Sequence, residues 1–293
     1  MAQRLPVLWL YGPPGVGKTT VAWELCTRLW DDGVRAACVD IDQLGMCYGP
    51  PTSENCFPEP VDDPGRHRIG TRNLDAVAAN ARDAGAACLV VSGIVDAERG
   101  IDLRLLPNVE LTAIRLRAEI DVLRQRLGVR ARPGEDFDEI VRDAAALDRL
   151  DGPCVDTTGL SVDEVRQQIC QHVGDWPGAD TPTMSVIPEA DLPGRILWVS
   201  GPRHEGKSMI GWQIYRQSRL AGTNTAFVDL VQLGILRPAD PKDPGHRRLR
   251  AANLAAVWRV FRAAGAECLV VARPLPGTED GIPGSDQAER TII

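Results

Sequence analysis

The chain has 293 residues, of which 44% are hydrophobic and 25% are charged, as in ordinary soluble globular proteins with one large or two modest domains. Its net charge of −7 argues against nucleic acids and anionic membranes as partners, and no apolar run is long enough to span a bilayer. The eight cysteines form no Cys-x-x-Cys pair, so we interpret them as buried, reduced thiols of a cytoplasmic protein.

The first part of the chain alternates apolar runs of strand length with amphipathic segments. The strands are predicted at 5–11, 35–41, 86–94, 109–116 and near 153–156. Helices are predicted at 18–32 and 71–85, twice within 119–150, and before residue 173. Because the strands are continuously apolar and alternate with helices, we predict a three-layer α/β fold around a parallel sheet.

A glycine-rich loop separates the first predicted strand from the first predicted helix. In this context Gly12-x-x-x-x-Gly17-Lys18-Thr19 is the pattern of a phosphate-binding P-loop. Glycines let backbone N–H groups surround phosphate oxygens, the lysine neutralises the terminal phosphates, and the threonine hydroxyl is available to Mg²⁺. We therefore predict ATP and Mg²⁺ as cofactors, with ATP held by Gly12, Pro13, Pro14, Gly15, Val16, Gly17, Lys18, Thr19 and Thr20.

An acidic pair ends the second predicted strand in the segment VDIDQLG. Asp40 and Asp42 are two residues apart and would lie on the same side of an extended chain. Beside a P-loop, one carboxylate can hold Mg²⁺ through water while the other accepts a proton from an attacking hydroxyl. We predict Thr19 and Asp40 as metal ligands, and Lys18, Asp40 and Asp42 as catalytic residues.

Arginines gather in the segment DPGRHRIGTRN, at the start of the next predicted helix. Arg66 and Arg72 at a helix N-terminus are a plausible anion trap for an acceptor that carries phosphate or carboxylate. Surface arginines without a ligand are the alternative interpretation.

The chain repeats itself. The segment 9–45 aligns with 198–234, including both tryptophan pairs Trp9/Trp198 and Trp23/Trp212, and 63–92 aligns with 243–272. We interpret this as an internal duplication whose second copy is cut short. The predicted units are a P-loop domain at 1–173, a Pro-rich linker at 174–193, a degenerate P-loop unit at 194–273 and a disordered tail at 274–293.

The second copy retains a weaker phosphate-loop pattern but not the rest of the site. The pattern comprises Gly201, Gly206, Lys207 and Ser208. Val231 stands in place of Asp42, and Ala252 in place of Arg72. Because a half-sheet exposes unpaired edges, this unit must dock on the first copy, pair with another chain as in a homodimer, or remain poorly folded.

With these motifs, residues 5–173 resemble the small P-loop kinases, which include shikimate, gluconate and adenylylsulfate kinases. The resemblance implies metal organisation by Asp40, contact of Asp42 with the substrate hydroxyl, and approach of the Gly93 turn to the substrate. In LRQRLGVRARPGED it implies a lid whose arginines close over the transferred phosphate: Arg126, Arg130 and Arg132. In VDTTGLSVDEV it implies backbone contacts beside adenine from Asp156, Thr157, Thr158 and Gly159. Ser92 stands where an aspartate is usual, which weakens an interpretation as a mechanical ATPase.

The sequence thus predicts a Mg²⁺-dependent kinase that transfers the γ-phosphoryl group of ATP to a small-molecule acceptor. The alternative is a non-catalytic nucleotide-binding regulator or scaffold that uses the second unit for partner contacts. A kinase-like toxin acting on a nucleotide sugar is a third reading, for which the chain shows no specific feature.

Overall fold

The computed structural model describes residues 3–53, 55, 57–58, 65–130, 137–178, 184–185, 191–202, 205–241, 243 and 245–274. The predicted tail beyond Pro274, and parts of the predicted linker and lid, lie outside these residues. No helix within the described ranges is long and apolar enough to cross a membrane.

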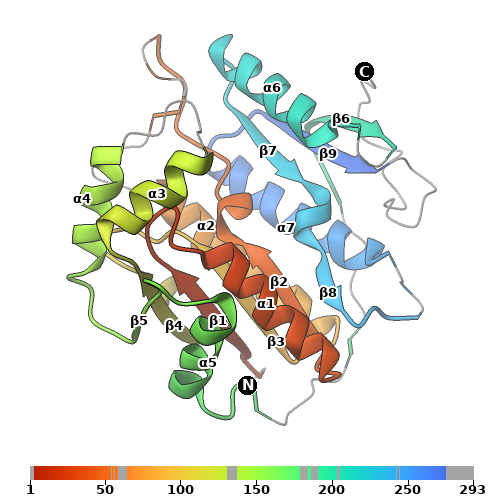
Figure 1. The fold of residues 1–293 in the computed structure, drawn as a ribbon. Coiled ribbons are helices and arrows are strands. Elements are labelled where there is room, and N and C mark those ends of the chain that lie inside the picture. Colours follow the sequence, from red (N-terminus) through yellow and green to blue (C-terminus); the bar gives the residue numbers. More distant parts are fainter. Residues whose placement is uncertain are drawn as a thin grey trace.

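The first sheet has the strand order β5-β4-β1-β3-β2-β8 (Figure 1). Its strands are β1 (Leu5–Tyr11), β2 (Ala36–Asp40), β3 (Cys88–Gly93), β4 (Val109–Arg117), β5 (Cys154–Asp156) and β8 (Ile235–Arg237). Strands β1 to β5 pair in parallel, as predicted, because each pair is joined by a helical crossover. Strand β8 is antiparallel and comes from the far end of the chain.

Helices cover both faces of this sheet, which confirms the layered α/β architecture. Side chains of β1 alternate between the faces: Leu8 and Leu10 pack in one core with α1 (Lys18–Asp31) and α5 (Val162–Val173). Val7 and Trp9 pack on the other face, with α2 (Gly65–Asp83). Two further helices, α3 (Ile120–Arg130) and α4 (Phe137–Leu147), lie between β4 and β5 in the chain. Short 3₁₀ helices follow β2 (η1, Ile41–Leu44) and precede β4 (η2, Leu103–Leu105).

Residues 195–274, here named the C-terminal unit, form a second sheet with the order β6-β9-β7. Its elements are β6 (Arg195–Gly201), α6 (Lys207–Leu220), β7 (Thr225–Asp229), η3 (Leu230–Leu233), α7 (Arg247–Ala263) and β9 (Cys268–Pro274). Apart from β8, these elements follow one another in the same order as β1, α1, β2, η1, α2 and β3 of residues 3–173, here named the N-terminal unit. Common ancestry of the two units stays a proposal from the sequence.

The C-terminal unit docks on the N-terminal unit rather than standing apart from it. Helices α2 and α7 pack against each other, and one apolar core runs through both units, including Trp9 and Trp198. At this contact the Asn80 amide donates a hydrogen bond of 2.9 Å to the side-chain oxygen of Asn253. Of the three fates that the half-sheet allowed, docking on the first unit is therefore the one observed.

Each unit covers the exposed strand edge of the other. Strand β8 of the C-terminal unit pairs with β2, where Ile235 lies opposite Cys38. In the opposite direction, the Phe227 N–H of β7 donates to the Met46 carbonyl at 3.2 Å. By the alignment, Cys38 corresponds to Phe227 and Met46 to Ile235, so the two contacts are equivalent. These contacts pair part of the exposed edge of β2 and one residue at the edge of β7.

The loop after η1 is held by a fully buried arginine of the C-terminal unit. Arg219 donates to the Gly49 carbonyl at 2.6 Å and to the Asn224 side-chain oxygen at 2.9 Å. Its guanidinium lies 5.5 Å from the ring centre of Phe57, whose ring in turn stacks on Trp212. The loop after η1 is thus anchored on the C-terminal unit.

Candidate functional site

The P-loop is the turn between β1 and α1, and its shape depends on glycine. Gly15 and Gly17 have φ values of 81° and 100°, in the left-handed region that other residues rarely adopt. A side chain on Gly12 would collide with the Leu116 carbonyl of β4. Helix α1 begins at Lys18, so its unpaired N–H groups face the loop.

The ammonium group of the loop lysine contacts the backbone of the loop itself. The Lys18 ammonium donates to the carbonyls of Gly12 at 2.8 Å and Pro13 at 2.9 Å. This places the charge across the mouth of the amide cradle, where phosphate oxygens would displace the two carbonyls.

A cavity of about 730 Å³ joins the P-loop to the acidic pair and to the start of α2. Its walls include the predicted residues Gly12, Pro13, Pro14, Gly15, Lys18, Thr19, Asp40, Asp42, Arg66 and Gly93. Val16 is buried beneath the loop and Thr20 is exposed on α1, and neither lines this cavity. Most of the predicted site is therefore brought together in one place.

The acidic pair differs from prediction in its backbone. Strand β2 ends at Asp40, and Asp42 lies in η1 rather than in an extended chain. The reason is local: the Asp40 carboxylate accepts the Asp42 N–H at 3.0 Å and so caps the turn. Both carboxylates still face the same cavity. Burial first, and then the neighbouring Asp42, raise the pKa of Asp40 to about 6.

The residues present fit a magnesium ion. The Thr19 hydroxyl and the Asp40 carboxylate are hard oxygen donors on one cavity wall, and a cation there would favour the ionised form of Asp40. No group of three His, Cys, Asp or Glu side chains that could hold a metal exists within the described residues. A Mg²⁺ ion bound by one carboxylate, one hydroxyl, phosphates and water needs no such group.

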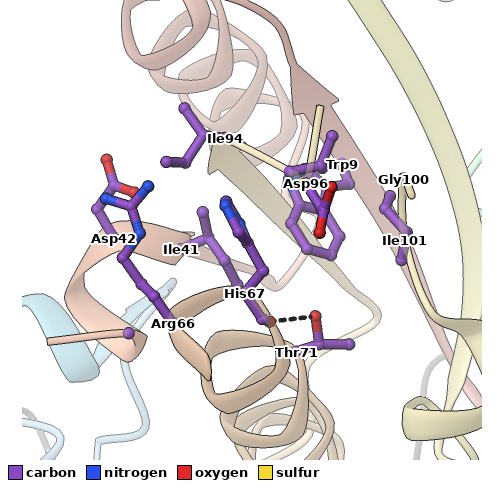
Figure 2. A pocket seen from close by; sticks show the side chains of 12 residues that line it. Trp9, Ile41, Asp42, Arg66, His67, Thr71, Ile94, Asp96, Gly100 and Ile101 are labelled. Atoms are coloured by element: carbon purple, nitrogen blue, oxygen red, sulfur yellow. Dashed lines mark hydrogen bonds between the residues drawn. The ribbon is translucent and has the colours of Figure 1, made fainter. Parts of the chain in front are cut away.

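An inner recess of about 20 Å³ opens beside the acidic pair (Figure 2). Figure 2 shows Asp42 and Arg66 at one end, His67 in the middle, and Asp96 with Trp9 at the other end. Ile41, Ile94 and Ile101 complete the wall with apolar surface. The recess therefore offers carboxylates, one guanidinium and an imidazole against an apolar face.

The start of α2 supplies Arg66 and His67 to this recess but not the whole predicted arginine cluster. Arg68 and Arg72 are exposed and do not line it, because they lie on other faces of the helix. The Thr71 hydroxyl donates to the His67 carbonyl at 2.7 Å. Burial, followed by the Arg66 charge, lowers the pKa of His67 to about 4, so its imidazole is neutral at physiological pH.

Gly93 ends β3 beside the acidic pair. Its φ is 137°, and a side chain there would collide with Ile41 and come within 3.4 Å of an Asp40 carboxylate oxygen. Glycine is thus required for the close approach of β3 to η1, whereas the approach of this turn to a substrate stays a prediction.

The segment that the resemblance places beside adenine adjoins the P-loop. The Thr157 hydroxyl, which is buried, donates to the Val16 carbonyl at 3.3 Å, and the Asp156 carboxylate accepts the Thr158 N–H at 2.9 Å. Gly159 has a φ of 69°. These residues lie next to the loop but outside the lining of the large cavity.

The three predicted lid arginines are placed differently. Arg126 of α3 donates to the Thr157 hydroxyl at 3.0 Å and to its carbonyl at 3.1 Å, so it ties α3 to the adenine-side segment. Arg130 is the last residue of α3, and Arg132 lies outside the described residues. A role for these arginines over the transferred phosphate remains a prediction.

Several lining residues escaped the sequence analysis. Trp9 reads as a core residue of β1, and Asp96 follows β3 without a motif. Glu139 and Asp143 line the large cavity from α4. They are one helical turn apart in the sequence, and this spacing was the signal that could have placed both on one face of the helix. Burial, with a smaller contribution from Glu139, raises the pKa of Asp143.

The second P-loop pattern also lies between a strand and a helix, with Gly201 ending β6 and Gly206 preceding α6. The Lys207 ammonium donates to the Pro202 carbonyl, and the Ser208 hydroxyl donates to Asp229 at 2.6 Å. This region faces a cavity separate from the one described above.

No protein-family model matches the chain, and no curated protein matches it either. Among solved structures it is similar to the tunicamycin resistance protein of Deinococcus radiodurans, at 20% identity over 61% of this chain and 99% of that one, with a TM-score of 0.41. It is also similar to the APS kinase CysC of Mycobacterium tuberculosis in complex with AMPPNP and APS, at 18% identity over 59% and 99% of the chains, with a TM-score of 0.41.

A gluconokinase from Sinorhizobium meliloti 1021 is similar at 16% identity over 57% and 90% of the chains, with a TM-score of 0.37. The functional argument for this chain is built on its own site.

Proposed function

We propose that the chain is a Mg²⁺-dependent phosphotransferase that moves the γ-phosphoryl group of ATP to a hydroxyl of a small-molecule acceptor. The observation that carries the proposal is one cavity of about 730 Å³ whose lining includes both the P-loop and Asp42, Arg66 and Gly93. Donor and acceptor sites that share one cavity are what an in-line transfer requires.

Each group has a role that follows from its chemistry. The loop amides and Lys18 bind the phosphates, while Thr19 and Asp40 hold Mg²⁺, which supplies charge neutralisation at the phosphoryl oxygens. Asp42 is exposed, and it accepts the proton of the attacking hydroxyl. Arg66, at the same end of the recess, orients the acceptor and the transferred group.

The recess favours a hydroxylic acceptor over a strongly anionic one. Two carboxylates, Asp42 and Asp96, line it together with a single guanidinium and a neutral imidazole. Carboxylates and imidazole hydrogen-bond hydroxyl groups but repel or fail to neutralise a phosphate. With a volume of about 20 Å³ the recess has room for one hydroxyl group of such a molecule, whose remainder would lie in the large cavity.

The test is phosphotransfer from Mg·ATP to a pool of hydroxylic metabolites, comparing the wild type with Asp42→Asn. We expect Asp42→Asn to lower turnover by about 10²- to 10⁴-fold with ATP affinity unchanged, because a general base is lost while the cradle remains. Arg72→Ala is the matched control. Arg72 belongs to α2, as Arg66 does, but its side chain is exposed and does not line the cavity, so we expect wild-type turnover.

Consumption of no acceptor by a protein that binds ATP would refute the proposal. That result would favour the alternative, a non-catalytic nucleotide-binding regulator. The docked C-terminal unit gives this alternative a physical basis, since α7 and β8 contact the unit that carries the nucleotide site.

A further inference from the structure

A second cavity, of about 760 Å³, opens in the C-terminal unit where it meets α1 of the N-terminal unit. Lys207 and Ser208 line it from the first turn of α6, and His246 and Arg250 from the start of α7. Further lining residues are Trp23, Asp229, Val231, Arg237 and Arg273.

The walls of this cavity are basic, although the chain as a whole carries a net charge of −7. The lining includes four basic residues, Lys207, Arg237, Arg250 and Arg273, and the guanidinium of Arg237 lies 5.0 Å from the ring centre of Trp30. Its one carboxylate, Asp229, already accepts hydrogen bonds from Ser208 and from the Val231 N–H. The positive field is felt by His246: burial first, and then Arg250, lower its pKa. Two helix N-termini add to this field.

The cavity differs from the catalytic one at the positions that matter for transfer. By the alignment, Val231 replaces Asp42, so no carboxylate stands where a hydroxyl would lose its proton. Arg273 replaces Gly93; it is buried, donates to the Ser200 hydroxyl at 3.0 Å and lies 4.2 Å from the ring centre of Trp198. Trp198 corresponds to Trp9, so this guanidinium fills the place of the acceptor recess.

A second arginine, Arg250, also stands in place of a glycine of the N-terminal unit. Arg250 replaces Gly70, is almost fully buried, and packs across Gly234, where any added side chain would collide with it. In the C-terminal unit, Arg250 and Arg273 therefore occupy the positions that correspond to the proposed acceptor site. Lys207 and the N-terminus of α6, which correspond to the phosphate-binding part of that site, are retained.

We propose that this cavity is a second, non-catalytic binding site for an oligophosphate anion, a di- or triphosphate group. The phosphates lie between Lys207 at the start of α6 and the cluster of Arg237, Arg250 and Arg273. No transfer occurs there, because both the base and the space for an acceptor are missing. The binding of phosphates here does not depend on the proposed function; only the absence of transfer rests on the role proposed there for Asp42.

An inorganic oligophosphate and the phosphates of a nucleotide share this chemistry, and Trp23 distinguishes the two sources. This side chain of α1 lines the cavity and is 46% exposed. An indole at the mouth can stack on a base, which adds affinity for a nucleotide but none for an inorganic anion.

The experiment uses calorimetric titration of the full chain carrying Lys18→Ala, which disables the first cradle, with tripolyphosphate, ADP and ATP. We expect one tripolyphosphate per chain. Adding Lys207→Ala should weaken its binding at least about tenfold, because a charge-assisted contact is lost. Arg237→Ala, an exposed side chain whose loss spares the core, should weaken it in the same direction.

The control is Arg216→Ala, which removes an equal charge from the exposed face of α6 away from the cavity and should leave the affinity unchanged. Tighter binding of ATP than of tripolyphosphate, abolished by Trp23→Ala, identifies a nucleotide as the source; equal binding identifies the anion alone. The proposal is overturned if the Lys18→Ala chain binds no tripolyphosphate, or if Lys207→Ala and Arg237→Ala bind it as well as Arg216→Ala does.

Discussion

At the scale of single residues, the site depends on side chains whose surroundings change their chemistry. Asp40 and His67 both lie in partly buried positions on the wall of the large cavity, and burial disfavours the charged form of each. A cation bound beside Asp40 would offset the cost of ionising this carboxyl group, and the His67 imidazole stays neutral at physiological pH. These properties follow from packing, which the residue types alone do not specify.

The pKa of His67 can be measured directly. We expect its imidazole resonances in the folded protein to titrate with a midpoint near pH 4, well below the usual value of about 6.5, with His67→Gln identifying the signals. Between about pH 4 and pH 6.5 the unfolded chain binds a proton at His67 that the folded chain does not. The free energy of unfolding therefore decreases as the pH is lowered through this range. A midpoint near 6.5 would show that the recess is wet and the side chain exposed.

At the scale of elements, the sequence predicted β1 to β5, the helices between them and the P-loop, because apolar runs, glycine turns and helical periodicity are local signals. It missed β8, whose three residues join a sheet through an edge formed far away in the chain. It also expected an extended backbone from Asp40 to Asp42, because a side-chain cap that ends β2 leaves no trace in hydrophobic periodicity.

The candidate site shows the same division. Lys18, Thr19 and the acidic pair were predicted from their spacing in the sequence. In contrast, Trp9 and Asp96 reach the inner recess, and Asp143 the large cavity, only through the packing of separate elements. The engagement of Arg126 with Thr157 was hidden for the same reason, since α3 and the segment after β5 meet only in the folded chain.

The contact between α6 and the loop after η1 depends on Arg219. We expect Arg219→Met to lower the free energy of unfolding by about 2–4 kcal/mol, because it leaves the carbonyls of Gly49 and Thr225 without their donor. Arg216→Met, an exposed change on the same helix, should stay within about 0.5 kcal/mol of the wild type. Urea denaturation measures both, and equal stability of the two variants would contradict a structural role for the buried guanidinium.

At the scale of the whole molecule, the two sheets behave as one body because they share a core. The apolar cluster that contains Trp9 and Trp198 also contains residues of α2 and α7, and each unit covers a strand edge of the other. Neither unit can lose its partner without exposing apolar surface and unpaired backbone groups.

We therefore expect a single cooperative unfolding transition for the full chain. Tryptophan fluorescence and far-ultraviolet circular dichroism should give the same midpoint, as two-state unfolding requires. Two separate transitions would mean that the shared core contributes little and that the units fold independently.

The central claim is that the amides of the N-terminal P-loop and the Lys18 ammonium bind the phosphates of ATP. It is tested most directly by calorimetric titration of Mg·ATP into a chain carrying Lys207→Ala, which isolates this site, with and without Lys18→Ala. We predict that Lys18→Ala weakens binding at least about tenfold while Arg28→Ala, an exposed change on α1, leaves it unaltered. Unchanged affinity in Lys18→Ala, or no binding of Mg·ATP before that change, would contradict the account.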